Sequence, residues 1–479
     1  MSKLNDLTIP GDASCISAPD ATDFRQGTLI LKDSQCTKPD SHGYCHCAIR
    51  TGGDVLSGVV EVAGPLNVNF TVEVKLEGIC RTWIGNEQNY SQIRVPTAVS
   101  EHRFLQEVDT VEHCPSPTDA ATKTEIQLPF SFVIPRRLIS ARPVSDLRFL
   151  RLHPTVKMGC SFDDYPTKSR YMQPLVFYHL LATIRQKEEG RFPPLPQCER
   201  EAIIMPTQAP DPPLYAESYG REYKLQSRVK LRRHLYNRPC GSLELSASEP
   251  LSLNLLVAAP RASTTVPIKV SFTPKHSATS DIVPYDWTLV VKSYVRMRVF
   301  YSAKCLDREP TLTDVAAKRH IALSTRLTAA EAREYSSLSW RVDRRSPFDA
   351  PGDADKKQLP WLAKLQAMVT APKTLPPSFL SQTAALRYSI VLEVTVANMQ
   401  MSAAVLELPV QVIRDPRTSY ATKTRISMWA LSTELRAIEP PRDLDSYPGI
   451  ERELDEESGD DFDDFHERSE GPPTYRRWI

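Results

Sequence analysis

Several features typical of membrane, secreted and disulfide-stabilised proteins are missing from this sequence. No stretch approaches the ~20 consecutive apolar residues that a membrane-spanning helix needs. The first residues, Met1 to Asp6, contain no apolar run like that of a signal peptide. The ten cysteines are scattered between Cys15 and Cys305, too thinly for a small disulfide scaffold. We therefore expect a cytosolic protein with reduced thiols.

Glycine is also scarce: the 479 residues include 17 Gly against 40 Pro. Proline lacks a backbone N–H donor and is excluded from helix interiors, whereas it suits edge strands, turns and linkers. The composition therefore argues against a helical bundle and against a doubly wound α/β fold.

Catalytic motifs are absent as well. The sequence has no Gly-x-Ser-x-Gly, phosphate-binding loop, protein-kinase signature or His-Glu-x-x-His. Cys45-His46-Cys47 lies near His42, but a structural zinc site needs a second ligand pair, for which His113-Cys114 is the one candidate. We expect a non-enzymatic protein with no metal and no cofactor. A pI near 7.6 and the lack of a recognition motif argue against nucleic-acid binding.

What the sequence does contain is repeated alternation of apolar and polar residues, the pattern of half-buried antiparallel strands. It is clearest over residues 67–80, and an upstream strand is expected over residues 55–62, with Gly64-Pro65 predicting a hairpin turn between them. Further strands are predicted at residues 125–135, 175–184, 222–233, 243–245, 251–257, 266–272, 287–301, 386–396 and 406–412. Many strands with prolines and short turns predict an all-β fold of two antiparallel β-sandwiches.

Three segments are harder to assign. Residues 143–174 have a mixed pattern that allows one short helix. Leu327 to Tyr335 contains good helix formers but is short and polar, so we predict a surface loop. Trp361 to Val369 fits an amphipathic helix or a strand, and its strand-like neighbours favour the strand.

Two proline-rich stretches, residues 193–196 and 206–213, mark an interdomain boundary. We predict five consecutive regions: a flexible arm (1–24), a first sandwich domain (25–200), a proline-rich linker (201–221), a second sandwich domain (222–416) and a disordered acidic tail (417–479).

Charge is distributed unevenly along the chain. Asp443 to Glu470 holds 13 acidic and two basic residues, a net charge of −11, so the rest of the chain carries +12. Ser458 precedes Gly459-Asp460-Asp461, which predicts phosphorylation by an acid-directed kinase. Two strands carry basic clusters: Arg228, Lys230, Arg232 and Arg233 in one, and Lys292, Arg296 and Arg298 in the other. Such a cluster either meets an acidic partner, a lipid headgroup or the chain's own tail, or is a solvated strand face.

Two copies of Pro-Pro-x-Tyr carry the sharpest functional signal. One, Pro472-Pro473-Thr474-Tyr475, follows the acidic segment, and the other, Pro212-Pro213-Leu214-Tyr215, lies in the predicted linker. Paired prolines pre-form the polyproline II helix that WW domains bind in an aromatic groove. We predict that Pro472, Pro473 and Tyr475 bind a WW domain. For Pro212, Pro213 and Tyr215 two readings stay open, since Leu214 and Tyr215 can instead pack between the sandwiches.

Several segments resemble the arrestin-like family, specifically the fungal arrestin-related trafficking adaptors. The similar segments are residues 53–62, 76–78, 128–135, 241–245, 249–251, 375–379 and 388–390, spread over roughly residues 25 to 415. The resemblance implies two antiparallel β-sandwiches in tandem. Visual arrestins have a tail segment that docks on the first domain, and no matching segment is present in this chain.

The resemblance also implies a function and partners. Adaptors of this family use Pro-Pro-x-Tyr motifs to bring a HECT-type ubiquitin ligase with WW domains to membrane permeases and transporters, promoting ubiquitination and endocytosis. It implies a cytoplasmic protein that is recruited to the plasma membrane or endosomes, with ubiquitin and the cytoplasmic tails of transporters or receptors as partners. Two alternatives remain: an arrestin-like signalling scaffold of the ambient-pH type, and a retromer-like coat subunit.

Overall fold

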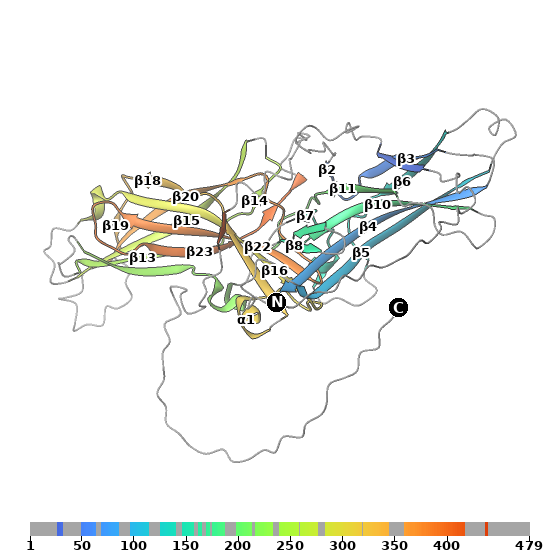
Figure 1. The fold of residues 1–479 in the computed structure, drawn as a ribbon. Helices are drawn as coiled ribbons and strands as arrows, with labels where there is room; N and C mark the ends of the chain where they lie inside the picture. The colour runs from blue at the N-terminus through green and yellow to red at the C-terminus, as the bar shows by residue number, and fades with distance from the viewer. Residues whose placement is uncertain are drawn as a thin grey trace, which may run out of the picture. The chain divides into compact units, whose positions relative to one another are not determined.

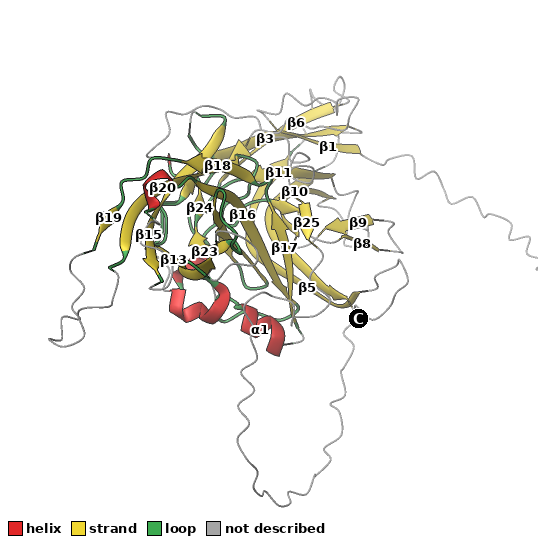
Figure 2. Ribbon diagram, turned by 90° about the vertical axis from the view of Figure 1, so that its left-hand side faces the viewer, coloured by secondary structure: helices red, strands yellow, loops and turns green. Residues whose placement is uncertain are grey.

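In the computed structural model of the chain, most of the regular secondary structure consists of β-strands (Figure 1 and Figure 2). The structure describes residues 26–31, 49–63, 69–85, 96–114, 125–139, 146–157, 161–164, 169–172, 175–186, 198–212, 216–232, 239–257, 259–275, 283–318, 320–343, 359–416 and 436–438. All of them lie within the unit formed by residues 1–438. Across these ranges, no helix is both long enough and apolar enough to cross a membrane. The expected all-β class is confirmed.

Residues 26–204, called the first part below, form two main sheets. The strands are β1 (Gln26–Leu31), β2 (Ile49–Arg50), β3 (Val55–Ala63), β4 (Phe70–Gly85), β5 (Pro96–His113), β6 (Glu125–Val133), β7 (Val156–Lys157), β8 (Ser161–Asp164), β9 (Ser169–Met172), β10 (Leu175–Gln186) and β11 (Cys198–Ile204). One sheet has the order β1-β3-β6 and the other β2-β11-β10-β4-β5, with β7 also paired to β10. The pairing is antiparallel except between β2 and β11. A 3-10 turn, η1 (Leu147–Leu150), precedes β7.

Residues 226–438, called the second part, form two main sheets. The strands are β12 (Gln226–Leu231), β13 (Gly241–Ala247), β14 (Leu253–Asn254), β15 (Arg261–Pro274), β16 (Leu289–Ser302), β17 (Ile321–Leu327), β18 (Glu331–Tyr335), β19 (Arg341–Val342), β20 (Trp361–Pro372), β21 (Phe379–Leu380), β22 (Ala384–Val396), β23 (Ala404–Val410), β24 (Val412–Ile413) and β25 (Arg436–Ile438). The orders are β12-β13-β15-β20-β19 and β21-β22-β16-β17-β25, with β18 paired to β16 and β23 to β22. Among the described strands, none pairs across the two parts.

Alternation along each strand explains which face is buried. In β4 the side chains of Phe70, Val72, Val74 and Leu76 are buried, while their polar neighbours are less so. In β6 and β15 every second residue is likewise buried. Burying one large aliphatic or aromatic side chain contributes about 1.5–3 kcal/mol, so these faces are the main source of stability. The predicted strands over residues 55–62, 67–80, 125–135 and 361–369 are confirmed.

The predicted hairpin between residues 55–62 and 67–80 is wrong. β3 pairs with β1 and β6, whereas β4 pairs with β5 and β10 in the other sheet. Each of the two strands has one apolar face, and the chain buries both faces by crossing from one sheet to the other. The alternation predicts which face is buried but does not identify the neighbouring strand.

Leu327 to Tyr335 was predicted as a loop, but residues 331–335 form β18, which pairs with β16. Its exposed, charged sequence suits an edge position, where one side of the strand stays unpaired. The one α-helix of the described chain, α1 (Leu312–Ala317), was not predicted. It is short, and a capping box between Thr311 and Asp314 stabilises its first turn. Two 3-10 segments, η2 (Ala216–Glu222) and η3 (Pro284–Asp286), complete the helices.

Candidate functional site

A buried cluster of charged side chains lies on β22, on the side of the strand opposite Leu386 and Tyr388. Its centre is Arg387, which is 4% exposed. Arg387 Nη2 donates to Glu222 Oε2 at 2.9 Å and to the carbonyl oxygen of Pro310 at 2.8 Å. Its guanidinium also stacks over the rings of Tyr219 (4.7 Å) and Phe300 (4.5 Å). Stacking on aromatic faces compensates part of the desolvation of a buried cation.

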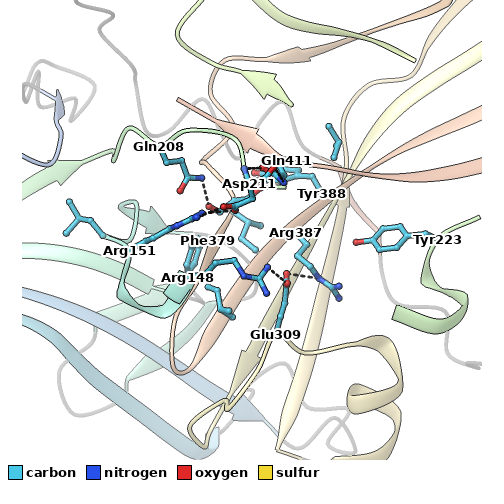
Figure 3. Close-up of a pocket in the computed structure, with 15 residues that line it drawn as sticks. Arg148, Arg151, Gln208, Asp211, Tyr223, Glu309, Phe379, Arg387, Tyr388 and Gln411 are labelled. Carbon is cyan, nitrogen blue, oxygen red and sulfur yellow. Dashed lines mark hydrogen bonds and ion pairs between the residues drawn. The ribbon is translucent and has the colours of Figure 1, made fainter. Parts of the chain in front are cut away.

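Glu309 links this cluster to the first part of the chain. Its carboxylate lies 3.5 Å from Arg387 Nε and 2.6 Å from Arg148 Nη1, and it accepts a hydrogen bond from the Tyr219 hydroxyl. Figure 3 shows Glu309 between Arg148 and Arg387. Arg148 belongs to η1 and is also paired with Asp146. The cluster is therefore a charged joint between the two parts.

Burial shifts the pKa values of several side chains in this joint. Desolvation raises the pKa of Glu222, although Arg387 opposes this effect. Desolvation also raises the pKa of Tyr223 to about 12. Arg387 keeps its charge, because the surrounding Tyr223, Glu309 and Glu222 raise its pKa more than burial lowers it. The ion pair between Arg387 and Glu222 therefore opposes the effect of burial on the pKa of both side chains.

A small hollow lies beside the joint. It is lined by residues of both parts, among them Arg148, Arg151, Asp211, Phe379 and Gln411 (Figure 3). Its volume is about 50 Å³, enough for a few water molecules. Pockets for small-molecule ligands are typically about 300–1,000 Å³. Arg148 and Arg151 are both ion-paired, with Glu309 and Asp211, so they do not present free charges to a ligand. The hollow is therefore bordered by the ion pairs of the joint.

A second contact between the parts is polar but uncharged. Cys80 is buried, and the hydroxyls of Ser381 and Thr383 lie 3.5 and 3.2 Å from its Sγ. Thr82 donates to the carbonyl oxygen of Ser302 at 2.6 Å. Burial raises the pKa of the Cys80 thiol, so it stays protonated and unreactive at neutral pH.

Residues 205–212, within the predicted linker, are held by hydrogen bonds on both sides. Met205 N–H donates to Arg50 O, and Gln208 N–H donates to Arg414 O. Asp211 is paired with Arg151, and Gln411 contacts the carbonyl oxygen of Pro212 at 3.3 Å. Residues 201–204, also assigned to the linker, belong to β11. This segment is therefore part of the joint.

The predicted WW-binding residues are placed only in part. Pro212 is exposed, while Pro213, Leu214 and Tyr215 lie outside the described residues. Pro472, Pro473, Tyr475 and Ser458 also lie outside them. The two readings of the linker copy therefore remain open.

The two basic clusters have different environments. Arg228, Lys230 and Arg232 are exposed along β12 and just after it, and Arg233 lies outside the described residues. In the other cluster, Lys292 pairs with Glu393 at 3.0 Å, and Glu407 pairs with Arg296 and, at 2.7 Å, with the buried Arg298. Each cation of the second cluster therefore has a carboxylate partner, and Arg296 and Arg298 share one.

His153 connects the two parts and predicts a pH effect. It is buried between Phe104 of β5 (ring centroids 4.6 Å apart) and Phe379 of β21 (5.9 Å). Desolvation, with a contribution from His102, lowers its pKa to about 3. The unfolded chain has an ordinary histidine pKa near 6.5. As the pH falls through that value, His153 binds a proton in the unfolded state but not in the folded state, so the free energy of unfolding decreases.

We expect His153→Leu to remove this pH dependence. Between pH 6.5 and 5 the variant should lose roughly 2 kcal/mol less unfolding free energy than the unchanged chain. Urea unfolding at both pH values measures the difference, and His320→Leu, a less buried histidine in the second part, is the control. An equal pH dependence in the His153 variant and the unchanged chain would contradict this assignment.

Sequence reasoning did not single out Arg387, Glu222, Glu309 or Arg148. One signal was available: Arg387 is a charge inside the apolar run from Ala384 to Val391. A charge there must be paired if the strand is central. Its acidic partner Glu222 lies 165 positions away along the chain, and no local pattern connects the two. In comparisons with known proteins, the sequence matches no family model and no curated protein.

Proposed function

We propose that this chain is a non-enzymatic adaptor of the arrestin-related type, which recruits a WW-domain HECT ubiquitin ligase to membrane transporters. The observation that carries the proposal is that a chain with two β-sheet parts also contains two Pro-Pro-x-Tyr motifs. Each part has its own two main sheets, as expected of two sandwich domains in tandem. One motif follows the second part, and the other begins at the exposed Pro212 beside the joint.

The joint supports an adaptor more than an enzyme. Its charges are used in pairing, its hollow accommodates only a few waters, and the described residues contain no group of three metal-ligating side chains. A connection made of ion pairs and hydrogen bonds between the two parts suits a protein that holds two partners side by side. In this proposal the ligase binds the motifs, and a transporter's cytoplasmic tail binds the sandwiches at the membrane.

The test is a binding measurement on the full chain with a ligase fragment that contains several WW domains. Tyr475→Ala should weaken binding strongly, because the tyrosine pocket of the WW groove is left empty. If both copies engage one ligase, avidity raises affinity by about 10²–10⁴, so Tyr215→Ala alone also weakens binding and the double variant abolishes it. Calorimetric titration gives the dissociation constants.

Tyr447→Ala is the matched control, since Tyr447 lies in the same acidic region but does not stand two positions after a proline pair, as the tyrosine of each motif does. Its affinity should equal that of the unchanged chain. Unchanged affinity in the Tyr215 and Tyr475 double variant would rule out the proposed docking. Loss with Tyr475→Ala alone, and none with Tyr215→Ala, would assign the linker copy to packing.

A further inference from the structure

One buried arginine of the second part has no carboxylate partner. Arg414 directly follows β24 and is 9% exposed. Among the residues that the structure describes, none forms an ion pair with Arg414, and its Nε–H has no acceptor. Desolvation lowers the pKa of the guanidinium, and no neighbouring carboxylate opposes this effect. The cation is therefore buried without a compensating charge.

Two arginines that are buried at least as deeply are compensated. Arg298, 4% exposed, lies 2.7 Å from Glu407, and Arg387, also 4% exposed, lies 2.9 Å from Glu222. A buried lysine or histidine can lose its proton, whereas arginine stays protonated at neutral pH. Removing such a cation from water without a partner is unfavourable for folding. Arg414 therefore needs an anion that the described chain does not supply.

Backbone hydrogen bonds fix the position of Arg414 beside the joint. Its carbonyl oxygen accepts from the backbone N–H of Gln208, in the segment that connects the two parts. The next residue, Asp415, is held by Asn254, whose Oδ1 accepts from its N–H at 3.1 Å and whose Nδ2 donates to its carbonyl oxygen at 3.3 Å. Although Asp415 is adjacent and buried, it forms no ion pair with Arg414. The nearest carboxylate in the sequence therefore does not compensate the cation.

The chemistry of the guanidinium limits the choice of ligand. Its N–H donors form a planar fork with no acceptor, and this fork matches two oxygens of a carboxylate or a phosphate. Hydrogen bonds between a guanidinium and such an anion are shorter and stronger than those between neutral groups. Because 9% of Arg414 is exposed, the group that reaches it has to be small.

We propose that Arg414 binds a small oxyanion, a phosphate or carboxylate group, which supplies the missing negative charge. The anion pairs with the guanidinium beside the segment that contains Gln208, and it stabilises the folded chain because it binds the folded state in preference to the unfolded state. The site does not include the ion pairs of Arg387 or the Pro-Pro-x-Tyr motifs. It goes beyond the proposed function and does not depend on it.

The test is urea unfolding of the full chain in sodium phosphate, with sodium chloride keeping the ionic strength constant. For a dissociation constant of about 1 mM, about 20 mM phosphate lowers the equilibrium constant of unfolding about twentyfold. Sodium acetate at the same ionic strength identifies the chemical group. Stabilisation by phosphate alone assigns a phosphate site, and stabilisation by both anions assigns a general oxyanion site. Stabilisation by neither would overturn the proposal.

Arg414→Met should change stability in opposite directions with and without the anion. In chloride alone the variant should have an equilibrium constant of unfolding about tenfold lower than the unchanged chain, because an apolar side chain of similar length replaces an unpaired buried cation. In phosphate the variant should gain nothing specific, so the unchanged chain becomes the equal or more stable of the two. Arg414→Lys keeps the charge but loses the planar fork, and its affinity for phosphate should fall about tenfold.

Arg232→Met is the matched control. Arg232 is exposed just after β12 and has no ion-pair partner among the described residues, so its substitution should change neither the stability nor the response to phosphate. An equal phosphate response in Arg414→Met and the unchanged chain would overturn the proposal. A loss of stability in Arg414→Met in chloride alone would also overturn it, since the cation would then already be compensated within the chain.

Discussion

Arg387→Met is expected to cost about 3–5 kcal/mol of unfolding free energy. The substitution keeps most of the side-chain volume but leaves Glu222, whose side chain is 2% exposed, without its cation. It also removes one of the two arginines beside Glu309, and the stacking on Tyr219 and Phe300. Removing one partner of a buried ion pair is costly because the other charge stays buried and unpaired. Urea unfolding measures the loss.

Two variants separate this explanation from a general packing defect. Arg308→Ala removes a cation that is 56% exposed and pairs with Asp314, so it should cost less than about 1 kcal/mol. Glu222→Gln combined with Arg387→Met should recover part of the loss, since the uncompensated carboxylate is then gone. If the double variant were as unstable as the sum of the single ones, the charge explanation would fail.

Gly58→Ala is expected to destabilise the first part by about 3 kcal/mol or more. Gly58 lies in β3, the central strand of the β1-β3-β6 sheet. A Cβ there would overlap the carbonyl oxygen of Ile30 and lie 2.6 Å from Cζ of Phe130. The Phe130 ring is buried and the carbonyl belongs to the neighbouring strand, so neither moves easily. Overpacking in a dense core typically costs about 1–3 kcal/mol, and a clash with backbone lies at the upper end.

Ser57→Ala is the matched control for this prediction. Ser57 precedes Gly58 and points to the opposite, partly exposed face of β3. Its substitution should change the unfolding free energy by no more than about 0.5 kcal/mol. Thermal or urea unfolding compares the two variants. Equal stability of Gly58→Ala and the unchanged chain would show that the sheet adjusts at this position.

The strands were predictable because their signal is local. In β4, apolar side chains alternate with polar ones at Phe70, Val72, Val74 and Leu76. This period of two predicts which face of the strand is buried. The same holds for residues 361–369, where the alternation through Leu365 and Val369 correctly favours a strand. Proline abundance and many short strands likewise indicated the all-β class.

Pairing and charge compensation were not predictable in this way. The crossing of the chain from β3 to β4, between two sheets, depends on neighbours that lie far away in the sequence. Lys292, Arg296 and Arg298 resemble the basic cluster on β12 in sequence, yet all three form ion pairs with Glu393 or Glu407. A count of charges along the chain cannot detect this, because the partners are on other strands.

The sequence alone determined the all-β class, most of the buried strand faces, the acidic composition of residues 443–470 and both Pro-Pro-x-Tyr motifs. These depend on residue type and on spacings of a few positions. Only the tertiary structure decided which strands pair, which of the described cations are ion-paired, and that Arg387, Glu222, Glu309 and Arg148 form one joint. The physical reason is that a β-sheet brings together residues from distant segments, and their charges interact through space rather than along the chain.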